Sequence, residues 1–279
     1  MRIIITGASS GLGLASASAF AQAGHNILML ARGEQRLNQA AEELKSKYPA
    51  AAIETQVLDV SDFEQVRDFA KNQTKTVDVL MNNAGLMGPD FKLSAQGIES
   101  QMATNHLGHF LLTNLLWQRL AKDSGRVISL SSVVHRRSKL EATSKEEIAG
   151  ATGKYERWSR YADSKLACLF FARELDIRSK QSGSQILSIA AHPGWALTGL
   201  QANYPNTFDF LAQSAEVGAR SQIQAALDPG LRGGEFIGPR FEAWGEPKLI
   251  AGSKHSRELA VMKRLWEISE ELTGEGFSV

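Results

Sequence analysis

The chain has 279 residues, of which 43% are hydrophobic and 22% are charged, and its formal net charge is +1. This is the composition of an ordinary globular protein with a sizeable core, and the charge balance gives no indication of a nucleic-acid or acidic-membrane partner. The one cysteine, Cys168, excludes an intrachain disulfide and is typical of a reducing compartment, where we expect it as a small buried side chain. The chain begins MRIIITGASSG, without a charged leader, and has no apolar run long enough for a membrane span, which predicts a cytoplasmic protein.

Short aliphatic runs alternate with longer segments of helical period along the chain. Strands are predicted at residues 2–6, 26–31, 53–58, 78–81, 126–130, 185–190 and 234–237, and helices at 11–23, 34–48, 62–72, 97–121, 160–180 and around Trp266. This alternation predicts an α/β fold, a doubly wound parallel sheet with its ligand crevice at the carboxyl ends of the strands. We interpret residues 1–279 as a single domain in which the polar, charge-rich segment 133–160 is a surface insertion.

A glycine-rich turn, TGASSGLG at residues 6–13, lies between the first strand and the first helix. Its glycines allow a tight turn and the close approach of a pyrophosphate, while the helix N-terminus supplies free N–H donors and the positive end of a dipole. The alternative is a plain strand-to-helix connection, but three glycines in this context favour phosphate binding.

The spacing TGxxxGxG resembles the short-chain dehydrogenase/reductase family, and further segments follow in the order of that family. They are NNAG at residues 82–85, Asn105 in NHLGH, Ser131-Ser132 after the fifth strand, YADSK at 161–165, and Pro193-Gly194 followed by Thr198. The resemblance reaches to about residue 200 and implies a Rossmann fold. Tyr161 follows Ser132 by 29 positions, about twice the usual family spacing, which is similar to the retinol-dehydrogenase-like branch and to protochlorophyllide reductase. Ala84-Gly85 and the shorter chain favour the former.

The resemblance implies an oxidoreductase that moves a hydride between a nicotinamide and a carbonyl or alcohol carbon, with Asn105, Ser132, Tyr161 and Lys165 as catalytic residues. Residues four apart on a helix share one face, so the Lys165 ammonium favours the phenolate form of Tyr161, as an acid/base at working pH requires. Ser132 would hold the substrate oxygen, with Ser131 as the alternative. Asn105 would hold a water that links Lys165 to solvent, or would instead join the helix to the sheet by hydrogen bonds.

The residues expected to bind the cofactor are Gly7, Ser9, Ser10, Gly11, Leu12, Gly13, Arg32, Asp59, Val60, Asn83, Ala84, Gly85, Tyr161, Lys165, Pro193, Gly194 and Thr198. The second strand ends without the acidic residue that accepts ribose hydrogen bonds in NAD sites, and Arg32, helped by Arg36, can pair with a 2′-phosphate. We therefore predict NADP(H) in preference to NAD(H), the alternative being that Arg32 is an exposed strand-end charge. Asp59 is expected at the adenine amino group, or as a cap of the helix that begins near Asp62.

Apolar side chains gather in the segment 195–213, which covers the substrate in the family. They predict a lipophilic carbonyl or alcohol substrate, although core packing explains them almost as well: Trp195, Leu197, Leu200, Tyr204, Phe208, Phe210 and Leu211. The rival interpretations are an NAD-linked alcohol dehydrogenase of the same family and a non-catalytic NADPH-sensing protein. Relatives pair through the helices at 97–121 and 160–180, so a homo-oligomer is an open alternative, which the C-terminal extension from Lys254 would alter.

Other patterns are interpreted as structural. His106 and His109 lie three apart on a helix, but no third ligand at a suitable spacing accompanies them, so we predict no metal site. His192 is expected as a strand-end residue near the nicotinamide. The basic residues 135–137 are interpreted as a solvated loop, with a substrate carboxylate as the alternative partner, and Trp266 is expected to dock an amphipathic C-terminal helix to the body.

Overall fold

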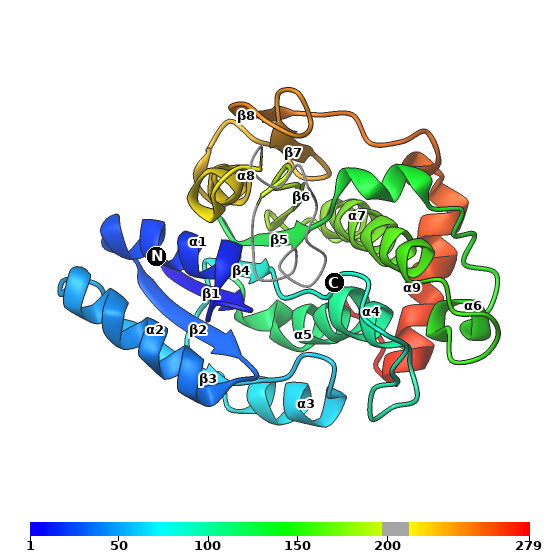
Figure 1. Ribbon diagram of the computed structural model, residues 1–279, viewed down its shortest axis with the longest axis horizontal. Helices are drawn as coiled ribbons and strands as arrows, with labels where there is room; N and C mark the ends of the chain where they lie inside the picture. The colour runs from blue at the N-terminus through cyan, green and yellow to red at the C-terminus, as the bar shows by residue number, and fades with distance from the viewer. Residues whose placement is uncertain (197–211) are drawn as a thin grey trace.

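The computed structural model describes residues 1–196 and 212–279, which form a sheet flanked by helices on both faces (Figure 1). The strands are β1 Arg2–Thr6, β2 Asn26–Ala31, β3 Ile53–Val57, β4 Val79–Asn82, β5 Arg126–Leu130, β6 Leu187–Ala191, β7 Phe236–Pro239 and β8 Pro247–Leu249. The α-helices are α1 Gly11–Gln22, α2 Glu34–Lys47, α3 Phe63–Lys71, α4 Ser100–Met102, α5 Gly108–Leu116, α6 Lys145–Ala149, α7 Arg157–Gln181, α8 Ala215–Leu227 and α9 Leu259–Thr273. A π-helical turn, Ala103–Leu107, joins α4 to α5, and 3-10 turns cover Trp117–Arg119, Val133–Arg137 and His255–Arg257.

The sheet has the strand order β3-β2-β1-β4-β5-β6-β7-β8, and every pairing is parallel except that of β7 with β8. The order reverses at β1, which lies between β2 and β4. In a doubly wound sheet this reversal opens a crevice at the carboxyl ends of the strands. The predicted doubly wound parallel sheet is therefore confirmed.

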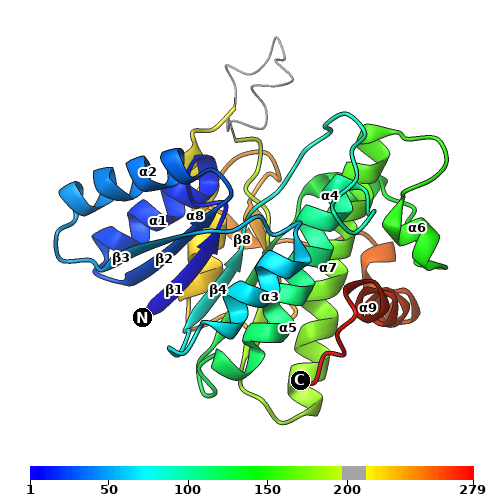
Figure 2. The same cartoon turned by 90° about the horizontal axis from the view of Figure 1, so that it is seen from below.

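The core lies in two apolar layers, one on each face of the sheet (Figure 2). Helices α1, α2 and α8 cover one face, and α3, α5 and α7 cover the other. The first strand shows the alternation that this requires, since the fully buried Ile4 packs into one layer while Ile3 and Ile5 pack into the other. A strand covered on both faces is continuously apolar, which is why these runs were readable from the sequence.

Helix α9 forms an additional layer outside α7. The buried Trp266 ring lies 5.0 Å from the ring of Phe110 in α5 and 5.9 Å from that of Phe171 in α7. The expected docking role of Trp266 is thus confirmed. The same contacts cover part of the surfaces of α5 and α7.

Several boundaries differ from the prediction. The segment 97–121 is not one helix: it becomes helical at Ser100, passes through the π-helical turn and ends at Arg119. Strand β7 begins two residues after the predicted position and is not the last strand, because β8 follows it. Neither β8 nor α8 was predicted.

The segment 133–160 is not simply a surface insertion. Leu140, Ala142 and Ile148 are buried in the same apolar cluster as α9, and α6 contacts α9. These three apolar residues are spaced irregularly among charged ones, so no periodic pattern marked them as buried. Within the described ranges, no helix has the length and apolar character that crossing a membrane requires.

Candidate active site

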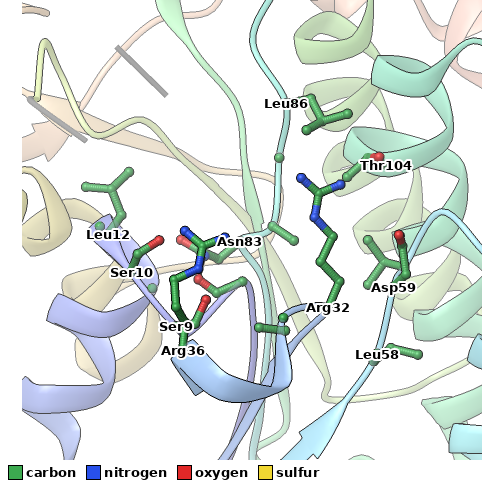
Figure 3. A pocket seen from close by; sticks show the side chains of 18 residues that line it. Ser9, Ser10, Leu12, Arg32, Arg36, Leu58, Asp59, Asn83, Leu86 and Thr104 are labelled. Atoms are coloured by element: carbon green, nitrogen blue, oxygen red, sulfur yellow. Dashed lines mark hydrogen bonds between the residues drawn. The ribbon is translucent and has the colours of Figure 1, made fainter. Parts of the chain in front are cut away.

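The glycine turn forms one wall of a cavity of about 430 Å³ at the carboxyl ends of β1, β2 and β3 (Figure 3). Helix α1 begins at Gly11, and its N-cap Ser10 makes no side-chain capping bond, so the first N–H groups of the helix remain available to an anion. Gly7 has a φ of 68°, and a Cβ there would lie 2.9 Å from the Cα of Ala84. Glycine is therefore needed at this position to bring the segment 82–85 against the turn.

Twelve of the residues expected to bind the cofactor line this cavity: Gly7, Ser9, Ser10, Gly11, Leu12, Gly13, Arg32, Asp59, Val60, Asn83, Ala84 and Gly85. Arg36, named as a helper, lines it too, as do residues outside the expected cofactor set: Ala31, Gly33, Leu58, Leu86 and Thr104. In Figure 3 the Arg36 side chain lies on the side of Ser9 and Ser10, and Arg32 extends toward Leu86 and Thr104.

Asp59 shapes the turn after β3 as well as lining the cavity. Its Oδ1 accepts hydrogen bonds from the backbone N–H and the hydroxyl of Ser61, at 2.9 and 2.7 Å. The alternative interpretation of Asp59 as a helix cap is wrong, because the side chain of Asp62 itself caps α3 by accepting from the N–H groups of Glu64 and Gln65.

A second cavity of about 680 Å³ is lined by five further candidates, Ser132, Tyr161, Lys165, Pro193 and Gly194, together with Ser131, whereas the candidate Asn105 lines neither cavity. Leu12, Asn83 and Gly85 line both cavities, so the two meet at these residues. The sequence missed most of the other walls: Met87, Leu130, Val133, Val134, Trp158, Ala196, Glu242 and Ala243. Trp158 had a readable signal, since it lies one turn before Tyr161 on the same helix face. Thr198 and most of the segment 195–213 fall outside the described residues.

Tyr161 and Lys165 lie beside each other on α7, at the wall of the second cavity. The Lys165 Nζ lies 5.8 Å from the centroid of the Tyr161 ring and donates a hydrogen bond to the Leu130 carbonyl at 3.1 Å. The ammonium is buried, so its charge is little screened by solvent. This bond ties the helix to the end of β5 and fixes the pair relative to the sheet.

The two serines after β5 have different environments. Ser131 is buried, and its hydroxyl donates to the backbone carbonyl of Lys165 at 2.7 Å, which uses its proton to hold α7. Ser132 is half-buried, and its Oγ accepts from the Val134 N–H at 3.3 Å, which leaves its own proton available. This difference favours Ser132 over Ser131 for contact with a substrate oxygen.

Thr6, which the sequence did not nominate as a site residue, organises the junction of the cavities. Its Oγ1 accepts hydrogen bonds from the N–H groups of Asn83 and Ala84, both at 2.9 Å, and lies 2.8 Å from Nε2 of His109. His109 Nδ1 lies 3.1 Å from the Asn105 carbonyl, which can only accept. Nδ1 therefore carries the imidazole proton, and Nε2 accepts the proton of the Thr6 hydroxyl.

The backbone carbonyl of Asn105 lies in the π-helical turn. It accepts from His109 and also from the thiol of Cys168, at 3.1 Å. The Asn105 side chain accepts from the Leu86 N–H at 2.7 Å and donates to the Leu86 carbonyl and the Ser164 hydroxyl. These bonds match the alternative role, joining helix to sheet edge; the water-holding role stays a prediction.

Three histidines and the cysteine noted in the sequence are buried and neutral. Burial lowers the pKa of His106 to about 3, of His109 to about 4 and of His192 to about 4, and it raises the pKa of the Cys168 thiol. His192 lies just after β6 and lines the second cavity, as expected of a strand-end residue. Among the residues that the structure describes, no three His, Cys, Asp or Glu side chains form a group that could hold a metal ion.

Comparison with known proteins agrees with this geometry. A sequence profile described as short chain dehydrogenase matches residues 1–144. The chain is 33% identical to short-chain dehydrogenase TIC 32 B, chloroplastic, of Brassica napus (96% of this chain, 87% of that protein) and 31% identical to human retinol dehydrogenase 12 (98% and 86%).

Solved structures are similar as well. An uncharacterised protein from Mycobacterium paratuberculosis has a TM-score of 0.86 and 35% identity, with 100% of this chain and 95% of that chain covered. A short-chain dehydrogenase from Sphingobium yanoikuyae in complex with NADPH shares the fold, with a TM-score of 0.59 and 23% identity over 80% of this chain and 82% of that one. The chain therefore belongs to the short-chain dehydrogenase family, in its retinol-dehydrogenase-like branch, and is an oxidoreductase acting on CH–OH or C=O groups.

Proposed function

We propose that this protein is an NADP(H)-dependent oxidoreductase that transfers a hydride between the nicotinamide and a carbonyl or alcohol carbon of a lipophilic substrate. The observation that carries the proposal is the meeting of the two cavities at Leu12, Asn83 and Gly85. One cavity has the uncapped helix N-terminus that suits a pyrophosphate, and the other has Tyr161 and Lys165 in its wall.

The residues of the chain have separate roles in this proposal. Bound nicotinamide supplies the hydride. Ser132 donates a hydrogen bond to the substrate oxygen and holds it against the Tyr161 hydroxyl, which delivers the proton in the direction of reduction. Lys165 holds the ribose hydroxyls and places its positive charge beside the Tyr161 ring.

Replacing Tyr161 by Phe tests this mechanism. The variant keeps the ring that packs beside Lys165 but has no proton to deliver, so we expect NADPH oxidation with carbonyl substrates to fall by at least about 100-fold. NADPH affinity, measured by fluorescence titration, should change less than about threefold. Substantial residual turnover would refute the assignment of Tyr161. NADPH binding by the wild-type protein without turnover on a broad carbonyl panel would instead favour an NADPH-sensing protein.

The preference for NADP(H) is supported by the cations at the end of β2. Arg32 and Arg36 are exposed, line the first cavity, and have no hydrogen bond or ion pair to other described residues. Two free guanidinium groups suit a 2′-phosphate. Arg32→Ala should weaken NADPH binding about tenfold while changing NADH binding little, since NADH lacks that phosphate. Equal losses of affinity for the two cofactors would contradict the preference. The same two measurements on Arg36→Ala would show how much of the NADPH affinity each arginine contributes.

The lipophilic substrate is supported by the walls of the second cavity. Met87, Val133, Val134, Trp158 and Trp195 are among its apolar lining residues, and the cavity is large enough for a substrate well beyond a few carbons. A panel of carbonyls assayed by NADPH oxidation should show kcat/KM rising with chain length. A preference for small polar carbonyls would contradict this part of the proposal.

A further inference from the structure

Three consecutive basic residues, His135, Arg136 and Arg137, follow Ser132 on a 3-10 turn, and their side chains have three different environments. His135 is buried: its Nδ1 donates to the Ser132 carbonyl at 2.6 Å, and its Nε2 accepts from the Ser253 N–H at 3.1 Å. It is therefore a neutral structural imidazole that ties the end of β5 to the C-terminal segment.

Arg136 is committed to structure as well. Its Nη2 donates to Glu242 Oε1 at 2.6 Å and to the Ala251 carbonyl at 2.7 Å. These bonds hold the 3-10 turn against the segments on either side of β8. The ion pair with Arg136 also balances the negative charge of Glu242, which lines the second cavity.

Arg137 lines the same cavity, but no hydrogen bond or ion pair joins its side chain to any residue in the described ranges 1–196 and 212–279. The other charged groups in the cavity wall are accounted for, since Glu242 pairs with Arg136 and Lys165 bonds to Leu130 beside Tyr161. In the described wall of this largely apolar cavity, Arg137 is thus the one charged side chain that has no hydrogen-bond or ion-pair partner.

We propose that Arg137 binds a carboxylate at the far end of the substrate, so that the preferred substrates are lipophilic carbonyl compounds with a terminal carboxylate. This inference rests on the proposed function, which it extends from a lipophilic substrate to an amphipathic anionic one. A guanidinium binds a carboxylate through two parallel hydrogen bonds, and a single cation balances a single negative charge better than it balances a phosphate dianion.

The backbone gives the approximate separation of the two residues that would hold the ends of such a substrate. Ser132 and Arg137 are five residues apart, and the intervening turn is fixed by the bonds from Val134 N–H to Ser132 Oγ and from His135 N–H to the Ser132 carbonyl. A 3-10 turn rises roughly 2 Å per residue, so the two positions are about 10 Å apart along it. An extended nine-carbon chain spans a comparable distance.

The test compares 9-oxononanoate with its methyl ester as substrates, both in the presence of NADPH. The wild-type protein should prefer the carboxylate, and Arg137→Met, which keeps an apolar stem, should lower the ratio of the two kcat/KM values about tenfold. The matched control is Lys139→Met, which removes the same charge from an exposed residue that lines neither cavity. This control should keep the wild-type ratio, and the wild-type preference should weaken with salt.

A binding experiment separates failure of this inference from failure of the proposed function. Nonanoate and its neutral analogue nonanamide are titrated calorimetrically into the NADPH-loaded protein, which reduces neither. Tighter binding of nonanoate that is lost in Arg137→Met but kept in Lys139→Met supports the carboxylate site even if no aldehyde is turned over. Turnover of both aldehydes without a carboxylate preference, or a preference that survives in Arg137→Met, overturns the inference and leaves the proposed function intact. Equal binding of nonanoate and nonanamide also overturns it.

Discussion

The hydroxyl of Thr6 is the group on which the junction of the two cavities depends, and Thr6→Val removes it with little change in shape. The hydroxyl accepts from the N–H groups of Asn83 and Ala84 and donates to Nε2 of His109. Valine fills the same space but can neither accept nor donate. The substitution therefore leaves the Ala84 N–H and the Nε2 atom of His109 without a partner, and it leaves the Asn83 N–H with only its bond to the Met81 carbonyl at 3.0 Å.

The expected loss follows from the burial of these groups. A buried polar group left unpaired costs about 1–3 kcal/mol. His109 is fully buried, whereas Ala84 is half-buried and regains some hydration, and Asn83 keeps its bond to the Met81 carbonyl, so the substitution should lower the free energy of unfolding by about 3 kcal/mol. For a chain of this length that corresponds to a fall in Tm of roughly 6–12 °C. Because Asn83 and Gly85, on either side of Ala84, line both cavities, NADPH affinity should fall as well.

Two variants serve as controls in urea unfolding and NADPH titration. Thr6→Ser keeps the hydroxyl and should retain NADPH affinity. Thr113→Val removes another buried hydroxyl on α5, which accepts from the Asn82 side chain but lines neither cavity. It should lower stability by about 1–2 kcal/mol without changing NADPH affinity. If Thr6→Val unfolds and binds NADPH as the wild type does, the hydroxyl does not organise the junction.

Two further predictions concern stability. The pKa values of His106, His109 and His192 are lowered by burial to about 3, 4 and 4, below the usual 6.5. The unfolded chain therefore binds their protons first, so stability should fall as pH drops from about 6.5 toward 4, by about 2 kcal/mol per histidine at pH 5, and unfolding at pH 7 and 5 checks this. His109→Gln should flatten the profile, and an unchanged slope would argue against a neutral buried His109. Trp266→Ala should cost about 3–5 kcal/mol, because the ring is buried between α5 and α7; a loss under about 1 kcal/mol would show that α9 is not docked as described.

The fold and most of the cofactor cavity were readable because their signals are local. Continuously apolar strands, a glycine turn before a helix, and a Tyr and a Lys one turn apart are each visible within a few residues. Elements without such a signal were missed. Strand β8 has only three residues and pairs with β7 in an antiparallel direction, and the π-helical turn around Asn105 interrupts a sequence that has an ordinary helical period.

The sequence by itself determined the order of the motifs, the doubly wound sheet, the family and the nomination of Tyr161 with Lys165, because hydrophobic period and spacing encode these directly. Only the tertiary structure decided which polar groups find partners. Ser131 and Ser132 are adjacent in the chain, as are Arg136 and Arg137, yet in each pair one side chain donates to a backbone carbonyl far away in the sequence, while the other lines the cavity with its donor groups available. The carbonyls that Ser131 and Arg136 bond to lie 34 and 115 residues away in the sequence, so no local pattern predicts these bonds. Which side chains remain available for chemistry is therefore decided when the helices and the C-terminal segments pack together.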